Sequence, residues 1–119
     1  GLKSVSRMPP PSPEIEKFSE AYREKYDTEP SSFTFSGRDN VYIAADALER
    51  AGTLKDKAKI RQAFLDTDFE GFIGHYTFGP NGENFIPLGI QMVENGEVKY
   101  AWIGDQDELV VFIKKIMQK

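Results

Sequence analysis

The segment from Phe69 to Glu83 reads FEGFIGHYTFGPNGE and joins glycine-spaced aromatic residues to a Gly-Pro-Asn-Gly turn. Pro80 presets its own φ angle, while Asn81 and Gly82 tolerate positive φ, so the segment predicts a strand that enters a tight reversal. None of its residues indicates catalysis. Alternation along the strand predicts two faces, with Phe72, Tyr76 and Phe78 on one and Ile73, His75 and Thr77 on the other.

Three helices are predicted on the amino-terminal side of this segment, and the first runs from about Pro13 to Tyr26. Ser12 is a good N-cap and proline is favoured in a first helical turn. Before it, Leu2–Ser6 predicts a short strand and Met8–Pro11 a stiff, polyproline-like connector. The apolar stripe of this first helix consists of Ile15, Phe18, Tyr22 and Tyr26.

The second helix is expected after a short extended segment, Phe33–Phe35. Ser36 would be its N-cap, with Asp39 in a capping-box arrangement, and Gly52 would end it. Its predicted inward face carries Val41, Tyr42, Ala45 and Leu48. Thr53 and Asp56 repeat the capping pattern for a third helix, whose buried side would be Ile60, Ala63 and Phe64 and which would fray at 66–68.

The rest of the chain reads as strand until near its end. A strand is predicted through Ile86, Leu88, Ile90 and Met92, with an edge or bulge near Pro87. Asn95-Gly96 is a strong hairpin signal and leads to a strand with Val98, Tyr100 and Trp102 on one face. A terminal helix would begin at 105–108 and carry Leu109, Phe112, Ile113 and Ile116. The predicted class is α/β (α+β in isolation), with residues 1–119 as a single domain or a fragment.

Composition excludes several classes of protein. The 119 residues carry a net charge of −4 from interspersed acids and bases, without the basic patch that nucleic-acid binding requires. There is no cysteine, hence no disulfide and no thiolate chemistry. No apolar run approaches the roughly 20 residues that span a bilayer. The chain begins with Gly rather than Met, which predicts a processed chain or a piece of a longer one.

Candidate chemical groups are few, and each has a structural explanation. His75 is the only histidine, and no orienting partner or nucleophile is indicated for it. Asp66, Asp68 and Glu70 alternate like calcium ligands, but they lack the glycine and terminal glutamate of a calcium loop, so a solvated helix end is favoured. No glycine-rich phosphate loop occurs. We therefore expect no enzymatic activity, no cofactor and no metal site.

Three stretches together resemble periplasmic solute-binding proteins of the Leu/Ile/Val-binding type, which serve ABC importers of branched-chain amino acids and amides. They are the helix pattern KFSEAYREKY at 17–26, the stretch SGRDNVY…ALERAG within 36–52, and the Phe69–Glu83 segment. The ordered combination covers roughly residues 1 to 103. Members of that family are about three times this length, so the resemblance implies that only the carboxy-terminal third is represented here.

The resemblance also implies a mechanism and a location. Family members close two α/β lobes around a ligand and pass it to an ABC permease, in the periplasm or at the cell surface. By analogy the first helix would belong to one lobe, Ser36 to about Phe78 to the other, and the late strands to the first again. The small-molecule, amino-acid-like ligand and the permease would be partners of the full-length parent, and the chain alone would not bind ligand fully.

Arg38 departs from the family pattern, which has a tyrosine at this position. An arginine there could reach an acidic ligand group, although a surface substitution near the hinge also explains it. The candidates for the cleft or hinge are Phe35, Ser36, Arg38 and Asp39, against a structural interpretation in which Ser36 and Asp39 cap the helix and Phe35 is core. The alternative function is a stand-alone interaction module that pairs as a homodimer or by domain swapping.

Overall fold

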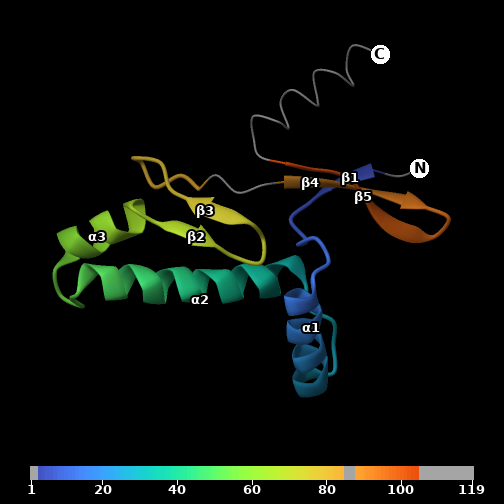
Figure 1. Cartoon of the computed structure of the whole chain (residues 1–119), viewed down its shortest axis with the longest axis horizontal. Coiled ribbons are helices and arrows are strands. Elements are labelled where there is room, and N and C mark those ends of the chain that lie inside the picture. Colours follow the sequence, from blue (N-terminus) through green and yellow to red (C-terminus); the bar gives the residue numbers. More distant parts are fainter. Residues whose placement is uncertain (1–2, 85–87, 105–119) are drawn as a thin grey trace, which may run out of the picture.

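The computed structural model describes residues 3–84 and 88–104 and shows a mixed α/β chain with two small antiparallel sheets (Figure 1). One sheet has the strand order β1-β4-β5, and the other is the hairpin β2-β3. The elements are β1 (Lys3–Ser6), α1 (Pro13–Tyr26), α2 (Ser32–Ala51), α3 (Lys57–Leu65), β2 (Asp68–Glu70), β3 (His75–Thr77), β4 (Leu88–Glu94) and β5 (Glu97–Gly104).

Helix α1 has the predicted bounds because its signals are local. The Ser12 hydroxyl accepts a hydrogen bond from the Ile15 N–H at 3.2 Å, Pro13 occupies the first turn, and Asp27 ends the helix in the left-handed region at φ 52°. Ile15, Phe18 and Tyr22 are half-buried, as the stripe predicted. Tyr26, at the end of the stripe, is 54% exposed, so its assignment to the core was wrong.

Helix α2 begins earlier than predicted. Ser31 is the N-cap, and the Thr34 hydroxyl accepts a hydrogen bond from the Ser31 N–H at 3.1 Å. The predicted extended segment Phe33–Phe35 is therefore helical, and Ser36 lies inside the first turns instead of capping them. The alternation of aromatic and polar residues at 33–35 fits both the strand period and the helix period, because the run is so short. The N-cap at Ser31, five residues before the predicted one, makes the run helical.

The buried face of α2 is also different from the predicted one. Its buried residues are Phe35, Asp39, Ile43 and Ala47, which follow one another at four-residue spacing. Val41 is 68% exposed, Tyr42 is 53% exposed and Ala45 is also exposed, so these three predicted inward residues point outward. Leu48, the fourth, is half-buried. The error has one source: Asp39 was counted as a surface residue, although it sits at the centre of the buried stripe. Gly52 ends the helix at φ 61°, as predicted.

Helix α3 starts at Asp56, whose carboxylate accepts hydrogen bonds from the Ala58 and Lys59 N–H groups at 3.1 and 3.2 Å. Asp56 is thus the N-cap, and not the third helical residue that the capping pattern predicted. Ala63 is buried, as predicted. Arg50 at the end of α2 donates to the Ala63 carbonyl at 2.7 Å and so fastens α3 to α2.

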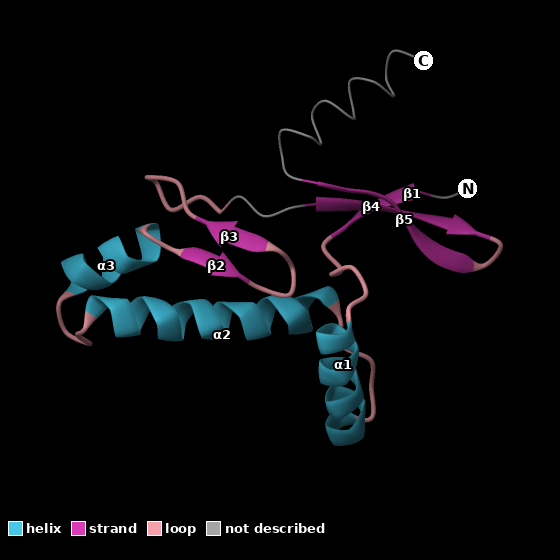
Figure 2. Cartoon of the chain, viewed as in Figure 1, coloured by secondary structure: helices cyan, strands magenta, loops and turns pink. Residues whose placement is uncertain are grey.

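The β2-β3 hairpin lies along α2 (Figure 2) and covers its buried face. Its strands pair Asp68 with Thr77 and Glu70 with His75, and residues 71–74 form the connecting turn. Ile73 was predicted on the strand face opposite to that of Tyr76, but both are buried in one cluster with Phe35 and Ile43. Ile73 lies in the turn, where side chains do not alternate between two faces as they do in a strand. The predicted Gly-Pro-Asn-Gly reversal is present, with the Gly82 N–H bonded to the Gly79 carbonyl at 2.8 Å. Asn81 does not have positive φ, whereas Gly82, the last residue of the turn, does.

The second sheet joins the two ends of the described chain. Strand β4 is central, because β1 pairs with it on one side and β5 on the other. The Asn95-Gly96 hairpin is confirmed, with φ values of 53° and 81° that suit a type I′ turn. An irregularity in register falls at Ile90/Gln91. The predictions for Ile86, Pro87 and the terminal helix lie outside the described residues.

Helix α1 belongs with α2 and the hairpin, which corrects the predicted division into lobes. The Phe18 ring packs 5.7 Å from Phe35 and 5.5 Å from Phe72, measured between ring centroids. Strand β4 pairs with β1 and with β5, and α1 does not accompany this sheet. The radius of gyration is 17.1 Å, against about 13 to 14 Å for a compact domain of this length. Much apolar surface therefore stays uncovered, including Phe33, which is 86% exposed.

Candidate functional site

A buried carboxylate, Asp39, organises the contact between α2 and the hairpin turn. Its side chain is 0% exposed and accepts hydrogen bonds from the backbone N–H groups of Phe72 at 3.0 Å and Ile73 at 2.9 Å. The Tyr76 hydroxyl donates to it at 3.1 Å, and an Arg38 Nη1 donates at 2.9 Å. Every lone-pair region of the carboxylate thus has a donor, which is the condition for placing a charge in an apolar core.

Tyr76 is held in its neutral form by this arrangement. Burial raises the pKa of the phenol, and the Asp39 carboxylate next to the hydroxyl raises it further. A neutral tyrosine keeps its proton available for the hydrogen bond to Asp39. The hydrogen bond from Tyr76 to Asp39 is therefore a fixed structural link between the hairpin and α2.

Arg38 is the only one of the four predicted site residues with a charge that reaches the surface. Its guanidinium lies 3.8 Å from the Phe72 ring centroid and 4.2 Å from that of Tyr42, and its side chain is 24% exposed. Arginine has five N–H donors, of which Asp39 engages one nitrogen. The two rings and the ion pair fix the position of the guanidinium while leaving donors free on its outer edge.

The structure separates the predicted site residues by role. Phe35 is 2% exposed and Asp39 is fully buried, so both build the core. Ser36 and Arg38 are half-buried and remain candidates for a cleft. The sequence reasoning missed Tyr76 and the 71–74 turn as partners of Asp39. The sequence did contain a signal for them. Asp39 lies midway between Phe35 and Ile43 on a stripe of four-residue spacing, and an acidic side chain on a buried stripe needs hydrogen-bond donors inside the core.

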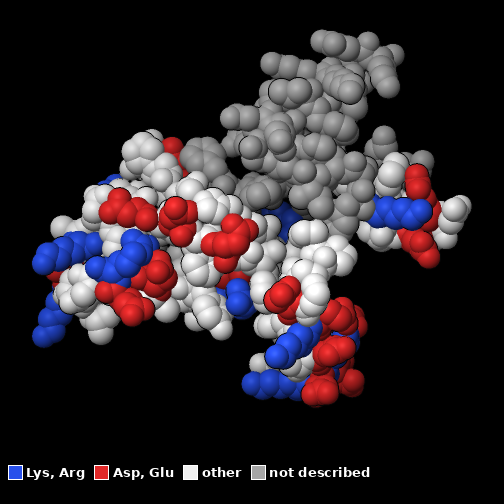
Figure 3. Space-filling view, viewed as in Figure 1, with Lys and Arg blue, Asp and Glu red and all other residues white. Residues whose placement is uncertain are grey.

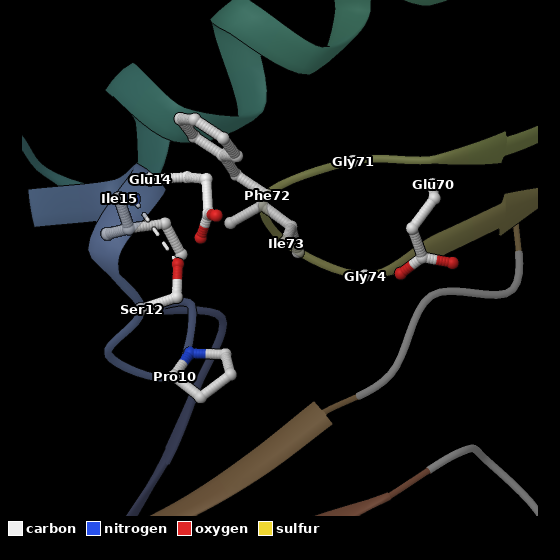
Figure 4. A pocket seen from close by; sticks show the side chains of 9 residues that line it. All are labelled: Pro10, Ser12, Glu14, Ile15, Glu70, Gly71, Phe72, Ile73 and Gly74. Carbon is white, nitrogen blue, oxygen red and sulfur yellow. Dashed lines mark hydrogen bonds between the residues drawn. The ribbon is translucent and has the colours of Figure 1, made fainter. Parts of the chain in front are cut away.

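A groove runs between the start of α1 and the hairpin turn (Figure 4). We call it the connector groove; it has a volume of about 430 Å³. The floor and walls are mainly apolar, and among the described residues the charged side chains that line it are those of Glu14 and Glu70. Its lining consists of Pro10, Ser12, Glu14, Ile15 and residues 70–74.

His75 lies on the exposed side of the hairpin between two carboxylates. Its Nε2 is 2.8 Å from Asp68 and its Nδ1 is 3.0 Å from Glu70. Only the imidazolium ion can donate from both nitrogens. The hydrogen bond to Glu70 is the main cause that raises the pKa of His75 above its ordinary value. Asp68 and Glu70 therefore belong to a strand-based ion cluster, and only Asp66 fits the predicted helix end.

We expect the pKa of His75 to exceed 6.5 and to fall when Glu70→Gln removes its principal partner. Because the folded-state pKa is the higher one, the stabilisation is complete below the unfolded value of 6.5 and is lost as pH rises through the folded pKa. An NMR pH titration measures this directly, since His75 is the only histidine. Glu83→Gln is the matched control. An identical titration curve for Glu70→Gln and the control would contradict the assignment.

The described residues hold no cluster of three or more His, Asp or Glu side chains arranged to hold a metal ion. Among the same residues, none of the helices has the length and apolarity needed to cross a bilayer. On the face shown in Figure 3, positive and negative side chains are interspersed over the helices. No described feature of this surface resembles the basic stripe of a nucleic-acid binder.

Comparisons with known proteins place this geometry in context. A family model described as "Periplasmic binding protein" matches residues 4–97. The leucine-binding protein LivK from Thermotoga maritima is 31% identical, with a TM-score of 0.71 over 91% of this chain and 32% of that one. The branched-chain amino acid binding protein LivJ from Streptococcus pneumoniae, solved with isoleucine, is 28% identical, with a TM-score of 0.69 over 87% of this chain and 30% of that one.

A third neighbour shares the fold at lower identity. It is a solute-binding protein of an ABC transporter from Rhodopseudomonas palustris in complex with 3,4-dihydroxybenzoic acid. It is 20% identical, with a TM-score of 0.74 over 88% of this chain and 31% of that one. The chain thus spans about a third of the length of the solved structures that it matches.

Proposed function

The chain belongs to the periplasmic binding protein family, and from this we propose that it is the carboxy-terminal part of a two-lobed solute-binding protein. That protein would act outside the cytoplasm and deliver branched-chain amino acids or related small molecules to an ABC permease. Two findings together support the proposal. The family model matches most of the chain, and a leucine-binding protein is 31% identical to it, although this chain spans only 32% of that protein.

The arrangement of the described elements supports a role at the junction of two lobes. The sheet of β1, β4 and β5 lies apart from the body formed by α1, α2, α3 and the hairpin (Figure 2). The chain passes between them twice, first between β1 and α1 through Arg7–Ser12 and later between β3 and β4. Two such crossings would let two bodies close on a ligand by small changes in a few dihedral angles.

Within this proposal, Ser36 and Arg38 are the residues of the chain that would face the cleft. Both lie near the amino-terminal end of α2, and the Arg38 guanidinium has free donors for a ligand carboxylate. Phe35 and Asp39, on the buried face of α2, would hold this helix in position. The remaining ligand contacts would come from the two thirds of the parent protein that this chain does not span, so the chain alone would bind ligand weakly or not at all.

A chimera tests the proposal. The 119 residues would replace the corresponding third of the leucine-binding protein from Thermotoga maritima, and calorimetry would measure leucine binding by the chimera, by that parent protein and by the chain alone. We expect binding by the chimera and the parent only. A chimera that unfolds cooperatively but binds none of leucine, isoleucine or valine would contradict the proposal, and so would leucine binding by the chain alone.

Self-association is the second candidate, favoured by the exposure of Phe33, Val41 and Leu54. Self-association would remove such exposed apolar side chains from water. Sedimentation velocity of the chain alone separates the two proposals. A dimer at micromolar concentration would support an independent module, whereas a monomer together with leucine binding by the chimera would leave only the solute-binding role.

A further inference from the structure

The connector groove has the dimensions of a small-molecule site. Its volume of about 430 Å³ falls within the roughly 300 to 1,000 Å³ that is usual for ligand pockets. Ile73 at its floor is only 6% exposed, and Pro10, Ile15 and Phe72 complete the apolar lining. A molecule seated there would bury hydrocarbon against four side chains.

The groove is fixed in shape from both sides. On one side, the Asp39 carboxylate binds the N–H groups of Phe72 and Ile73 and holds the turn against α2. On the other, Ser12 caps α1 and sets the start of that helix, as the dashed line in Figure 4 shows. A preformed groove loses little conformational entropy when a ligand enters.

The charge of the groove is negative and incompletely balanced. Glu14 extends from the first turn of α1 toward Phe72 and Ile73, and Glu70 lies at the other end of the turn (Figure 4). Glu70 is paired with His75, but Glu14 has no cationic partner among the described residues. Within 3–84 and 88–104, no Lys or Arg side chain lines the groove. An occupant that combines an apolar body with a positive charge would therefore complement it.

We propose that the connector groove binds an organic ammonium ion, with its hydrocarbon body against Ile15, Phe72 and Ile73 and its ammonium group at the Glu14 carboxylate. The apolar contacts would supply most of the affinity, and Glu14 would select the charge. This site is distinct from Ser36 and Arg38, which do not line the groove.

The test uses the full chain and three probes of equal length: hexylammonium, hexanol and hexanoate. Titration followed by ¹⁵N amide shifts should show hexylammonium at Ile15 and at 70–74, hexanol several times weaker, and hexanoate weaker still. Glu14→Gln should weaken hexylammonium binding roughly twofold to fivefold, as expected for one exposed ion pair. Glu20→Gln, an exposed acid of α1 outside the groove, should leave the binding unchanged.

Two results would overturn the proposal. Equal affinity for hexylammonium and hexanol would show that charge has no part in recognition. An equal effect of Glu14→Gln and Glu20→Gln would show that the response follows the net charge of the chain and not the groove. Both substitutions are on the exposed side of α1, so loss of the fold does not complicate the comparison.

Discussion

Replacing Asp39 by alanine is expected to lower the free energy of unfolding by about 3 to 5 kcal/mol, the range for removing one partner of a buried ion pair. The substitution leaves the N–H groups of Phe72 and Ile73 and the Tyr76 hydroxyl without an acceptor inside the core. It also leaves the Arg38 guanidinium unpaired beside the cavity. Each unsatisfied buried donor adds a penalty of its own, because water cannot replace the lost bond.

Urea unfolding of the full chain measures the effect, with Asp46→Ala as the matched control. Asp46 lies on the same helix and pairs with Arg50, but its side chain is 43% exposed. We expect the control to change stability by less than about 1 kcal/mol. Asp39→Asn keeps the shape and one acceptor oxygen, so it should fall between the two. Equal losses for Asp39→Ala and Asp46→Ala would show that the buried network does not hold the fold together.

Gly71→Ala should destabilise the chain by about 1 to 3 kcal/mol through overpacking. An added Cβ would lie 2.5 Å from the Asp39 Oδ2 and 2.7 Å from the Tyr76 Cε2. Neither atom can move freely, since the carboxylate is held by four donors and the ring is buried. The turn would have to separate from α2, which should also broaden or shift the amide signals of Phe72 and Ile73.

Gly79→Ala is the control for Gly71→Ala, because its added Cβ would meet the carboxylate end of Glu83 at a similarly short distance. Glu83 is exposed and can rotate away, so we expect a much smaller loss. The double variant Asp39→Ala/Gly71→Ala gives a second check. The new methyl group would occupy the space that the carboxylate leaves, so the combined loss should be smaller than the sum of the two single losses. Strict additivity would contradict the proposed contact.

The elements predicted well from sequence are those whose signals lie within a few residues. Ser12-Pro13 is sufficient to start α1, Gly52 to end α2, and Asn95-Gly96 to turn the hairpin, because each acts through its own backbone or its nearest hydrogen bonds. Capping and turn chemistry require no knowledge of the rest of the fold. These positions therefore agree between sequence and structure.

Two failures are local, because α2 begins at the Ser31 cap instead of Ser36 and α3 at Asp56 instead of Thr53. The other failures involve contacts between distant residues. The inward face of α2 was misassigned because the donors that make Asp39 a core residue lie more than 30 residues further along the chain. Ile73 was misassigned because its burial depends on the turn that Asp39 holds. The division into lobes was wrong for α1 because the packing of Phe18 against Phe72 has no local signature. The connector groove could not be predicted for the same reason, because its two sides are about 60 residues apart in the sequence.

The pairing of β1 with β4 has a consequence for the order of folding. Lys3 lies opposite Met92 and Ser6 opposite Gly89, so the loop that this pairing closes spans nearly the whole described chain. The helices and the β2-β3 hairpin can fold first, because their contacts close shorter loops. During that interval β1 is an unpaired strand, and its Val5 stays exposed even in the folded chain. Until β4 pairs with it, β1 is open to pairing with a strand of another chain.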